Sequence, residues 1–419
     1  MSAEAALRLA PAGTCRFCDA PLTQSVIDLG QSPPANAYLT AEELEHPEPT
    51  YPLHAYVCGS CFLVQLQDFH SPAELFTDYA YFSSYSDTWM RHVERYCDDM
   101  IRRFTLGPEH RVVEVASNDG YLLQFFSERG IPVMGIEPAG NVAHEAMAKG
   151  IPTVVRFFGV DAARGLAAQG HQADLLIGNN VLAHVPNLND FVAGLKIALK
   201  PAGVLTLEFP HLLRLLAETQ FDTIYHEHFS YFSLMTVKRI LAHHGLKVFD
   251  VEELPTHGGS LRVFACHDDA AHALSSSVAA VVAAEREAGL DRLDTYRNFG
   301  AAARTTRRML LDFLGGARLS GRSVVGYGAP AKGNTLLNYC GIGTDLIAYT
   351  VDRSPHKQGK FLPGTHIPIY HPDRIRATKP DFVLILPWNL RREIMEQMAH
   401  IRDWGGRFVV PIPHVRVYD

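Results

Sequence analysis

The stretch Arg111-Val112-Val113-Glu114-Val115-Ala116-Ser117-Asn118-Asp119-Gly120 predicts a buried strand that runs into a polar turn ending in glycine. An apolar helix face follows it, formed by Leu122, Leu123, Phe125 and Phe126. A strand, a turn and a helix in this order form the first βα unit of a doubly wound sheet. The sequence therefore predicts an α/β fold that binds its ligand above the carboxyl ends of the strands.

Further strand-like runs with polar ends support this interpretation. They lie at 133–136, 174–181 and 203–208. The run at 133–136 ends in Glu137, and a carboxylate at this position can hydrogen-bond the hydroxyls of a ribose. The first turn does not match GxGxxG, so a ligand with ribose and adenine but no pyrophosphate fits it better. We expect cofactor contacts from Glu114, Ser117, Asn118, Gly120, Glu137, Asn179 and Asn180, although Glu114 can equally cap a turn and Glu137 can equally end a solvated strand.

The densest chemistry lies in Tyr225-His226-Glu227-His228, between aromatic residues that can exclude water. A histidine suits proton abstraction near neutral pH, and a tyrosine hydroxyl can donate to a developing oxyanion. The same residues can also form a metal site, a helix cap or a wet surface turn. His184 follows the strand that ends at Asn180, and a lone histidine there is as often structural as functional.

Two CxxC pairs lie near the N-terminus, Cys15/Cys18 and Cys58/Cys61. Four thiolates in this pairing suit a tetrahedral zinc ion, and a site with four protein ligands has no open position for a reactant. The pattern predicts a structural zinc site in a segment too short for its own core. Four unconnected buried or redox-active thiols are the alternative.

A second α/β unit is predicted near the C-terminus. The stretch 323–335 combines a strand, a glycine turn and a helix start that can seat a phosphate, with Lys332 nearby. Basic residues at 353–360 follow the next strand. Together they indicate an anionic ligand, whereas the glycines alone would also fit an ordinary tight turn.

The whole chain has 419 residues, a net charge of −7 and 47% apolar residues, which predicts a globular protein of several domains. The acidic balance gives no reason to expect nucleic acid. No apolar run approaches the roughly eighteen residues of a membrane helix, and the first residues lack the basic start of a signal peptide. We therefore expect a cytoplasmic protein without membrane contact. Nothing in the sequence demands an oligomer, so a monomer is expected.

Taken together, these motifs resemble those of the sugar C-methyltransferases of deoxysugar biosynthesis. The resemblance covers nearly the whole chain. Its most specific pieces are the CxxC pairs, the turn at 114–121, and the stretches 180–184, 225–229, 257–259 and 326–332. It implies five segments: a zinc-binding module (1–75), a helical connector (76–108), a domain that binds S-adenosylmethionine (SAM; 109–270), bridging helices (271–318) and a Rossmann-like nucleotide-sugar domain (319–419).

The resemblance also implies the reaction and its residues. A nucleotide-linked 4-keto sugar would bind between the middle and C-terminal domains, with His228 as the base that removes the C3 proton and Tyr225 as the partner of the enolate oxygen. Tyr79, His184 and Glu227 would surround the sugar. Further substrate contacts are expected from His257, Tyr327, Lys332, Asn334 and Lys357. The alternatives are an NAD-dependent nucleotide-sugar oxidoreductase and a noncatalytic zinc-containing protein that binds RNA or protein.

Overall fold

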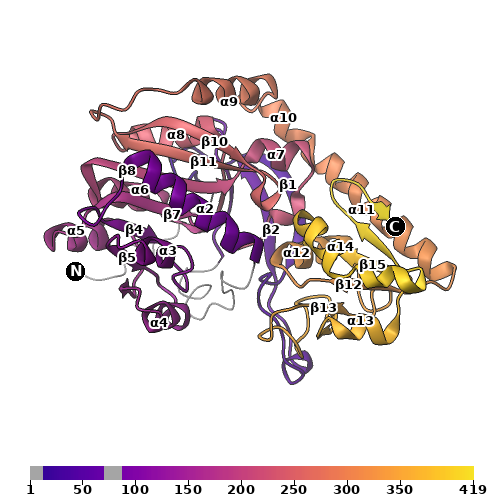
Figure 1. Ribbon diagram of the computed structural model, residues 1–419. Helices are drawn as coiled ribbons and strands as arrows, with labels where there is room; N and C mark the ends of the chain where they lie inside the picture. Colours follow the sequence, from indigo (N-terminus) through magenta and orange to yellow (C-terminus); the bar gives the residue numbers. More distant parts are fainter. Residues whose placement is uncertain (1–12, 70–86) are drawn as a thin grey trace.

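The computed structural model describes residues 13–69 and 87–419, whose strands form three sheets (Figure 1). The first sheet is antiparallel, in the order β1-β2-β3-β9. Its strands are β1 (Gln24–Ser32), β2 (Tyr51–Val57), β3 (Val64–Leu66) and β9 (Ser230–Tyr231). The last strand, β9, does not come from the N-terminal segment. It directly follows Tyr225-His226-Glu227-His228, here called the histidine-rich stretch. This stretch is therefore joined by backbone hydrogen bonds to the module that carries the CxxC pairs.

The second sheet has seven strands in the order β10-β11-β8-β7-β4-β5-β6. They are β4 (Val112–Val115), β5 (Val133–Ile136), β6 (Thr153–Val154), β7 (Ala173–Asn179), β8 (Leu199–Pro210), β10 (Leu246–Leu254) and β11 (Ser260–His267). β4 pairs with β5 and β7 in parallel, and all four of its residues are buried, as a strand covered on both faces requires. The associated helices are α2 (Asp87–Phe104), α3 (Leu123–Glu128), α4 (Gly140–Ala148), α5 (Val160–Ala168), α6 (Leu188–Ala198), α7 (Leu212–Ala217) and α8 (Leu234–His243).

The third sheet has six strands in the order β14-β13-β12-β15-β16-β17. They are β12 (Val324–Tyr327), β13 (Thr350–Val351), β14 (Ile369–Tyr370), β15 (Phe382–Ile385), β16 (Arg407–Val410) and β17 (Arg416–Tyr418). Its helices are α12 (Ala331–Cys340), α13 (Asp373–Thr378) and α14 (Arg391–Gln397). The bridging helices α9 (Ser276–Glu287), α10 (Leu293–Arg297) and α11 (Phe299–Leu319) run from the second sheet to the third (Figure 1). The prediction of an α/β fold is confirmed.

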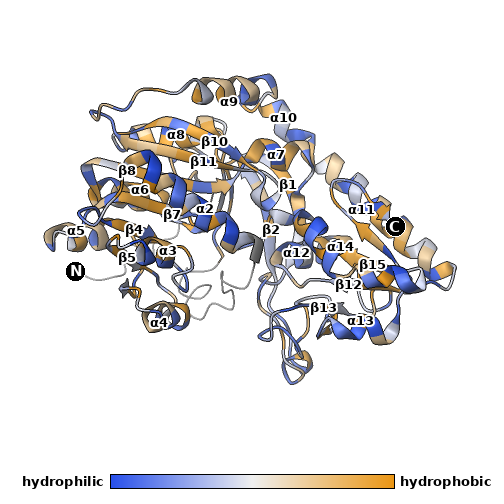
Figure 2. Cartoon of the chain, viewed as in Figure 1, coloured by the Kyte–Doolittle hydropathy of each residue, from blue (hydrophilic) through white to orange (hydrophobic). Residues whose placement is uncertain are grey.

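Short 3-10 helices lie at several strand ends and carry predicted site residues. They are η2 (Glu43–Glu45), η4 (Leu182–His184), η5 (Phe221–Thr223), η6 (Thr256–Gly258), η7 (Trp388–Leu390) and η8 (Ala399–Trp404). Figure 2 shows hydrophobic residues along the strands of the two larger sheets and hydrophilic residues on the outer helices. One apolar cluster includes Leu53 of β2, Ile224 and Trp388, so the first and third sheets share a core beside the histidine-rich stretch. Within the described ranges, none of the helices combines the length and apolarity that a bilayer crossing requires.

Candidate functional site

The segment from Tyr225 to His228 forms a tight turn, closed by a backbone hydrogen bond from the His228 amide to the Tyr225 carbonyl (2.8 Å). The Tyr225 hydroxyl lies 2.7 Å from Nε2 of His228. The other ring nitrogen, Nδ1, lies 2.9 Å from the Thr223 carbonyl oxygen, which can only accept a hydrogen bond. Nδ1 therefore carries the proton of the neutral ring, and Nε2 presents its lone pair to the hydroxyl.

Burial keeps this ring neutral. It holds the pKa of His228 well below its usual value, and repulsion by a protonated His184 acts in the same direction. His184, at the end of η4, lies with its ring centroid 4.8 Å from that of His228. Burial lowers the pKa of His184 to about 4, opposed by a hydrogen bond to the Glu227 backbone. Two neutral, half-buried imidazoles therefore meet edge to face.

Glu227 lies inside the same turn and is buried. Its two carboxylate oxygens accept hydrogen bonds from the amide nitrogen of Asn36, at 2.7 and 2.9 Å. Burial raises the pKa of Glu227 to about 7, while Asn36 and then Lys357 oppose this rise. No local sequence pattern connects Asn36 with Glu227, which lies 191 positions away.

His257 reaches the same edge of the second sheet from η6. Its backbone has a positive φ of 54°, and its Nε2 lies 3.4 Å from Nδ2 of Asn180. Burial lowers its pKa to about 4, and the positive charge of Lys332 acts in the same direction. The next residue, Gly258, has φ +92°, and a Cβ there would lie 2.5 Å from the Trp388 ring. The loop is thus closely packed against the C-terminal domain.

The structure brings Lys332 to this contact as well. Its Nζ donates to the Asn389 side chain (2.9 Å) and lies 4.6 Å from the centroid of Trp388. The Trp388 indole donates to Asp222 (2.6 Å), and burial raises the pKa of Asp222 to about 6. The sequence predicted no role for Asp222, although this residue lies three positions before the turn at Tyr225–His228, here called the reactive turn. Burial lowers the pKa of Lys332, opposed by the nearby Asp222.

Three other predicted substrate residues make protein contacts, of which only that of Asn334 joins two domains. Lys357 donates to the Ala329 carbonyl (2.8 Å), Asn334 donates to the Ala35 carbonyl (2.5 Å), and the Tyr327 hydroxyl donates to Gln397 (3.3 Å). Their roles toward a substrate stay predictions. Tyr79, predicted near the sugar, lies outside the described residues.

Polar groups gather at the carboxyl ends of β4, β5 and β7, where the cofactor contacts were predicted. Glu137 accepts backbone hydrogen bonds from Asn118 and Ala139, both at 2.9 Å. Burial raises its pKa, while these two hydrogen bonds oppose the rise. The side-chain amide of Asn179 is buried, and neither its nitrogen nor its oxygen has a hydrogen-bond partner among the described residues. These unused polar atoms, at the same edge of the sheet as the Glu137 carboxylate, fit the ribose and amino-acid ends of SAM.

The remaining predicted cofactor residues lie in or beside the first turn. Ser117 is fully buried, and Gly120 has φ +74°, with Ala146 and Ile151 so close that a Cβ would fall 3.3 and 3.1 Å from their side chains. Glu114 lies inside β4 and is fully buried. Burial raises its pKa well above the usual value, and a hydrogen bond from Tyr121 opposes this.

Replacing Glu137 with Gln is expected to weaken SAM binding. The Gln amide has only one acceptor atom, so it cannot receive both backbone N–H groups and still accept from a ribose. Hydrogen bonds to charged groups contribute about 1.5–3 kcal/mol, which corresponds to a rise in Kd of roughly ten- to hundredfold. Titration calorimetry with SAM measures this. Glu128→Gln, at an exposed position of the same βα unit, should keep the wild-type Kd. Equal Kd values for the two variants would contradict the assignment of Glu137.

The four predicted zinc ligands lie together, with all sulfur atoms within 4.8 Å of one another. The Cys15–Cys61 and Cys18–Cys58 sulfur pairs are each 3.5 Å apart, close to the edge of about 3.8 Å that a tetrahedron with 2.3 Å Zn–S bonds requires. The amide of Gln65 donates to the Cys15 sulfur (3.2 Å), as expected for a thiolate. The donor set fits zinc and leaves no position for a substrate.

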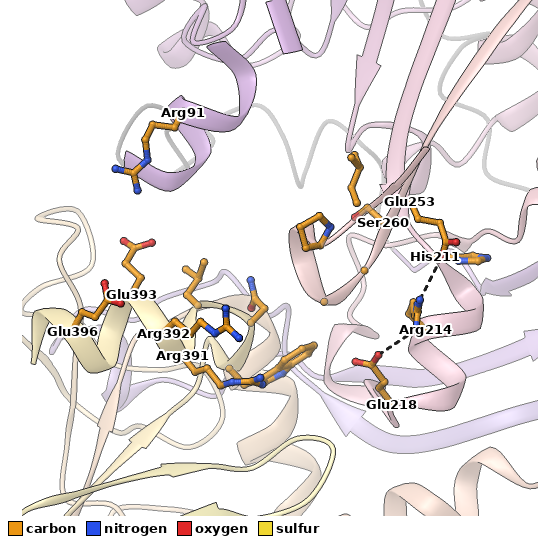
Figure 3. A pocket seen from close by; sticks show the side chains of 17 residues that line it. Arg91, His211, Arg214, Glu218, Glu253, Ser260, Arg391, Arg392, Glu393 and Glu396 are labelled. Carbon is orange, nitrogen blue, oxygen red and sulfur yellow. Dashed lines mark hydrogen bonds and ion pairs between the residues drawn. The ribbon is translucent and has the colours of Figure 1, made fainter. Parts of the chain in front are cut away.

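A hollow of about 830 Å³ lies between the second sheet and the C-terminal domain (Figure 3). Gly258 and Trp388 form its inner wall, so it adjoins the contact described above. Its charged lining residues are Arg91, Arg214, Arg391, Arg392, Glu218, Glu253, Glu393 and Glu396. Arg214 is paired with Glu253 and Glu218 (3.3 and 3.9 Å). Arg391 and Arg392 form no ion pair within the described part of the chain.

Three family models match the chain in one order: a zinc binding domain (residues 15–76), a methyltransferase domain (89–251) and a C-methyltransferase C-terminal domain (255–413). With the geometry above, they define a SAM-dependent methyltransferase that carries a zinc-binding module. The chain is 37% identical to the C-methyltransferase NovU of Streptomyces niveus over 407 residues, which cover 97% of each chain. The chain therefore belongs to the C-methyltransferase family that includes NovU. The oxidoreductase and the noncatalytic binding protein are set aside.

Solved structures with lower similarity match less than half of the chain. The PH0226 protein of Pyrococcus horikoshii is 16% identical, with 46% of this chain and 97% of that chain covered and a TM-score of 0.36. Magnesium protoporphyrin IX methyltransferase of Synechocystis, solved with bound SAM, is also 16% identical, with coverages of 42% and 79% and a TM-score of 0.33.

Proposed function

We propose that the protein transfers the methyl group of SAM to C3 of a nucleotide-linked 4-keto deoxysugar, with His228 as the base. One observation carries the proposal: the lone pair of Nε2, on a neutral, half-buried imidazole, lies 2.7 Å from the Tyr225 hydroxyl. A carbon beside a carbonyl becomes nucleophilic only when its proton leaves and its oxygen is stabilised. A base and a hydroxyl donor held side by side supply these two functions.

The chain's own groups act in the following way. With substrate bound, Nε2 of His228 takes the C3 proton and the Tyr225 hydroxyl turns from Nε2 to the ketone oxygen. The Thr223 carbonyl keeps the proton on Nδ1, so Nε2 stays the accepting atom before the step. When bound, SAM would supply an electrophilic methyl group, whose bond to the sulfonium sulfur would break as the bond to the substrate carbon forms, with S-adenosylhomocysteine as the leaving group.

The balance of charges within the site favours this order of reaction steps. The imidazolium formed at His228 is disfavoured by burial, so it needs a negative partner. The enolate oxygen provides that charge at the moment of proton transfer. Ionised Glu227 can provide it afterwards. We also propose that the enzyme acts as a monomer, divided into the five segments given above.

We place the nucleotide end of the substrate in the hollow of Figure 3. Its residues come from both the second sheet and the C-terminal domain, and its inner wall adjoins the reactive turn through Gly258, Trp388 and Lys332. Arg391 and Arg392 offer guanidinium groups that form no ion pair among the described residues, and guanidinium groups bind diphosphates in a bidentate way.

The double variant Arg391→Ala/Arg392→Ala is expected to raise KM for the nucleotide sugar roughly ten- to hundredfold while kcat changes little. The lost contacts lie far from the reacting carbon and act equally in the ground and transition states. Steady-state kinetics at saturating SAM measures the two constants. Arg318→Ala removes an exposed arginine elsewhere in the C-terminal region and should leave both unchanged. A fall in kcat at constant KM would contradict this placement.

The function itself is tested by mass spectrometry of reactions that contain SAM and a panel of nucleotide-linked 4-keto-6-deoxy sugars in deuterated water. A product heavier by one methyl, with enzyme-dependent deuterium exchange at the carbon to be methylated, is expected. Tight SAM binding without methylation of any sugar would overturn the substrate class and leave the cofactor in place.

A further inference from the structure

The central residues of the reactive turn both contact the N-terminal module. Nε2 of His226 lies 3.2 Å from the Pro52 carbonyl in β2, so this nitrogen donates to the module. The side chain of Glu227 receives both hydrogen bonds from Asn36, which lies in the loop that follows β1. Immediately after the turn, the Leu66 amide donates to the Phe229 carbonyl (3.0 Å) and β9 pairs with β3. The module therefore holds the turn at its centre and at its end.

The loop that carries Asn36 is itself fixed on two sides. The Tyr38 hydroxyl donates to the Ala329 carbonyl (2.6 Å) and contacts Oδ1 of Asn36 (3.2 Å). The Ala35 carbonyl accepts from Asn334 of the C-terminal domain. With its oxygen turned to Tyr38, the Asn36 amide has only N–H groups left for Glu227. This arrangement suits an ionised carboxylate, which accepts and does not donate.

We propose that Asn36 is a positioning residue of the methylation site, through which the zinc-binding module holds Glu227 ionised and fixes the turn that sets the Tyr225–His228 contact. The inference rests on the proposed function. The inference extends that function because it makes the zinc-binding module part of the active site. The four cysteines of the module alone would only stabilise its fold. Asn36 acts through Glu227 and does not itself touch the reacting atoms.

The charged and titratable groups around Glu227 determine in which direction its pKa should change when Asn36 is replaced. Those packed against it or within its electrostatic reach are Tyr38, His184, Tyr225, His228 and Lys357. Asn36 and Lys357 lower the pKa of Glu227, which burial raises to about 7. Removal of the Asn36 donors therefore raises this pKa further, and Glu227 then becomes ionised only at higher pH.

Asn36→Ala is expected to lower kcat at pH 7 at least tenfold, to leave the Kd for SAM unchanged, and to move the acid limb of the kcat profile upward by about one pH unit. Asn36→Asp should behave in the opposite way. Two adjacent carboxyl groups share one proton, so this variant loses activity as the pH rises and the second proton leaves.

Glu48→Ala is the matched control, because Glu48 also joins the module to the C-terminal domain, through the Gly364 amide (2.8 and 3.0 Å) and His366, away from the turn. It should leave the pH profile in place. Zinc content and melting temperature establish that each variant is folded. A loss that is independent of pH in both Asn36 variants, or no larger than in Glu48→Ala, would overturn the inference.

A second measurement tests the role of Asn36 without catalytic turnover. The side-chain carboxyl of Glu227 is followed by ¹³C NMR in the full-length zinc-loaded protein and assigned with Glu227→Gln. Its titration midpoint is expected at higher pH in Asn36→Ala than in the wild type. Identical midpoints would overturn the inference even if sugar methylation is established. A shifted midpoint in a protein that methylates no keto sugar would overturn the proposed function alone.

Discussion

His228→Asn is expected to lower kcat for methyl transfer by about a thousandfold while the Kd for SAM stays at the wild-type value. General-base catalysis contributes roughly 10²–10⁴-fold, and no other described group presents an unprotonated nitrogen 2.7 Å from the Tyr225 hydroxyl. The Asn side chain is uncharged and can still donate to the Thr223 carbonyl, so the turn should persist. Single-turnover kinetics and titration calorimetry measure the two quantities.

The same variant separates the base from the methyl donor. Deuterium exchange into the keto sugar, with S-adenosylhomocysteine in place of SAM, should fall in parallel with kcat, because both require removal of the C3 proton. His267→Asn is the control, since it removes an imidazole that contacts the Leu199 carbonyl at the other end of β11. It should retain full activity. Turnover of His228→Asn within tenfold of the wild type would show that another group is the base.

Removal of zinc is expected to abolish turnover and to melt the N-terminal module in one step. Structural zinc sites in small domains contribute about 10–16 kcal/mol in isolated peptides, and the four cysteines join the two ends of the segment that carries β1 and β2. Cys58→Ser should lose the metal, lower the melting temperature and release the β3–β9 pairing. Metal analysis, calorimetry and hydrogen exchange at the Leu66 amide measure the three effects.

Here the control is Cys97→Ala, a buried cysteine of α2 that is not a zinc ligand. It should retain one equivalent of zinc and lose only the stability of a small core side chain, about 1 kcal/mol. Its β3–β9 amides should stay protected. An unchanged melting temperature after complete zinc removal would contradict a structural role for the metal.

Local patterns in the sequence predicted much of this architecture. The strand-turn-helix at 111–126, the polar strand ends and the CxxC pairs each depend on neighbouring residues, and the structure places β4, β7 and the four sulfur atoms accordingly. The contact between Asn36 and Glu227 could not be predicted, because it depends on how three separate parts of the chain pack. Strand β9 has only two residues, too few for any periodicity.

Lys332 illustrates a second limit of prediction from local sequence patterns. A lysine after a glycine turn predicts a phosphate contact, and the chemistry of that prediction is sound. In the structure, its ammonium group lies over Trp388 and donates to Asn389, both from η7, and its role toward a substrate stays a prediction. Tertiary packing, which no local pattern records, decides whether this charge meets a ligand or another side chain.

The pairing of β9 with β3 also constrains how the protein is made. Val64 and its partner Tyr231 are separated by more than 160 residues, so the first sheet gains its last strand only after the ribosome has synthesised most of the middle domain. Contacts between distant residues form slowly, since a long loop must close first. The nascent module therefore exposes an open edge at β3 during translation, and early zinc binding would protect it from pairing with other chains.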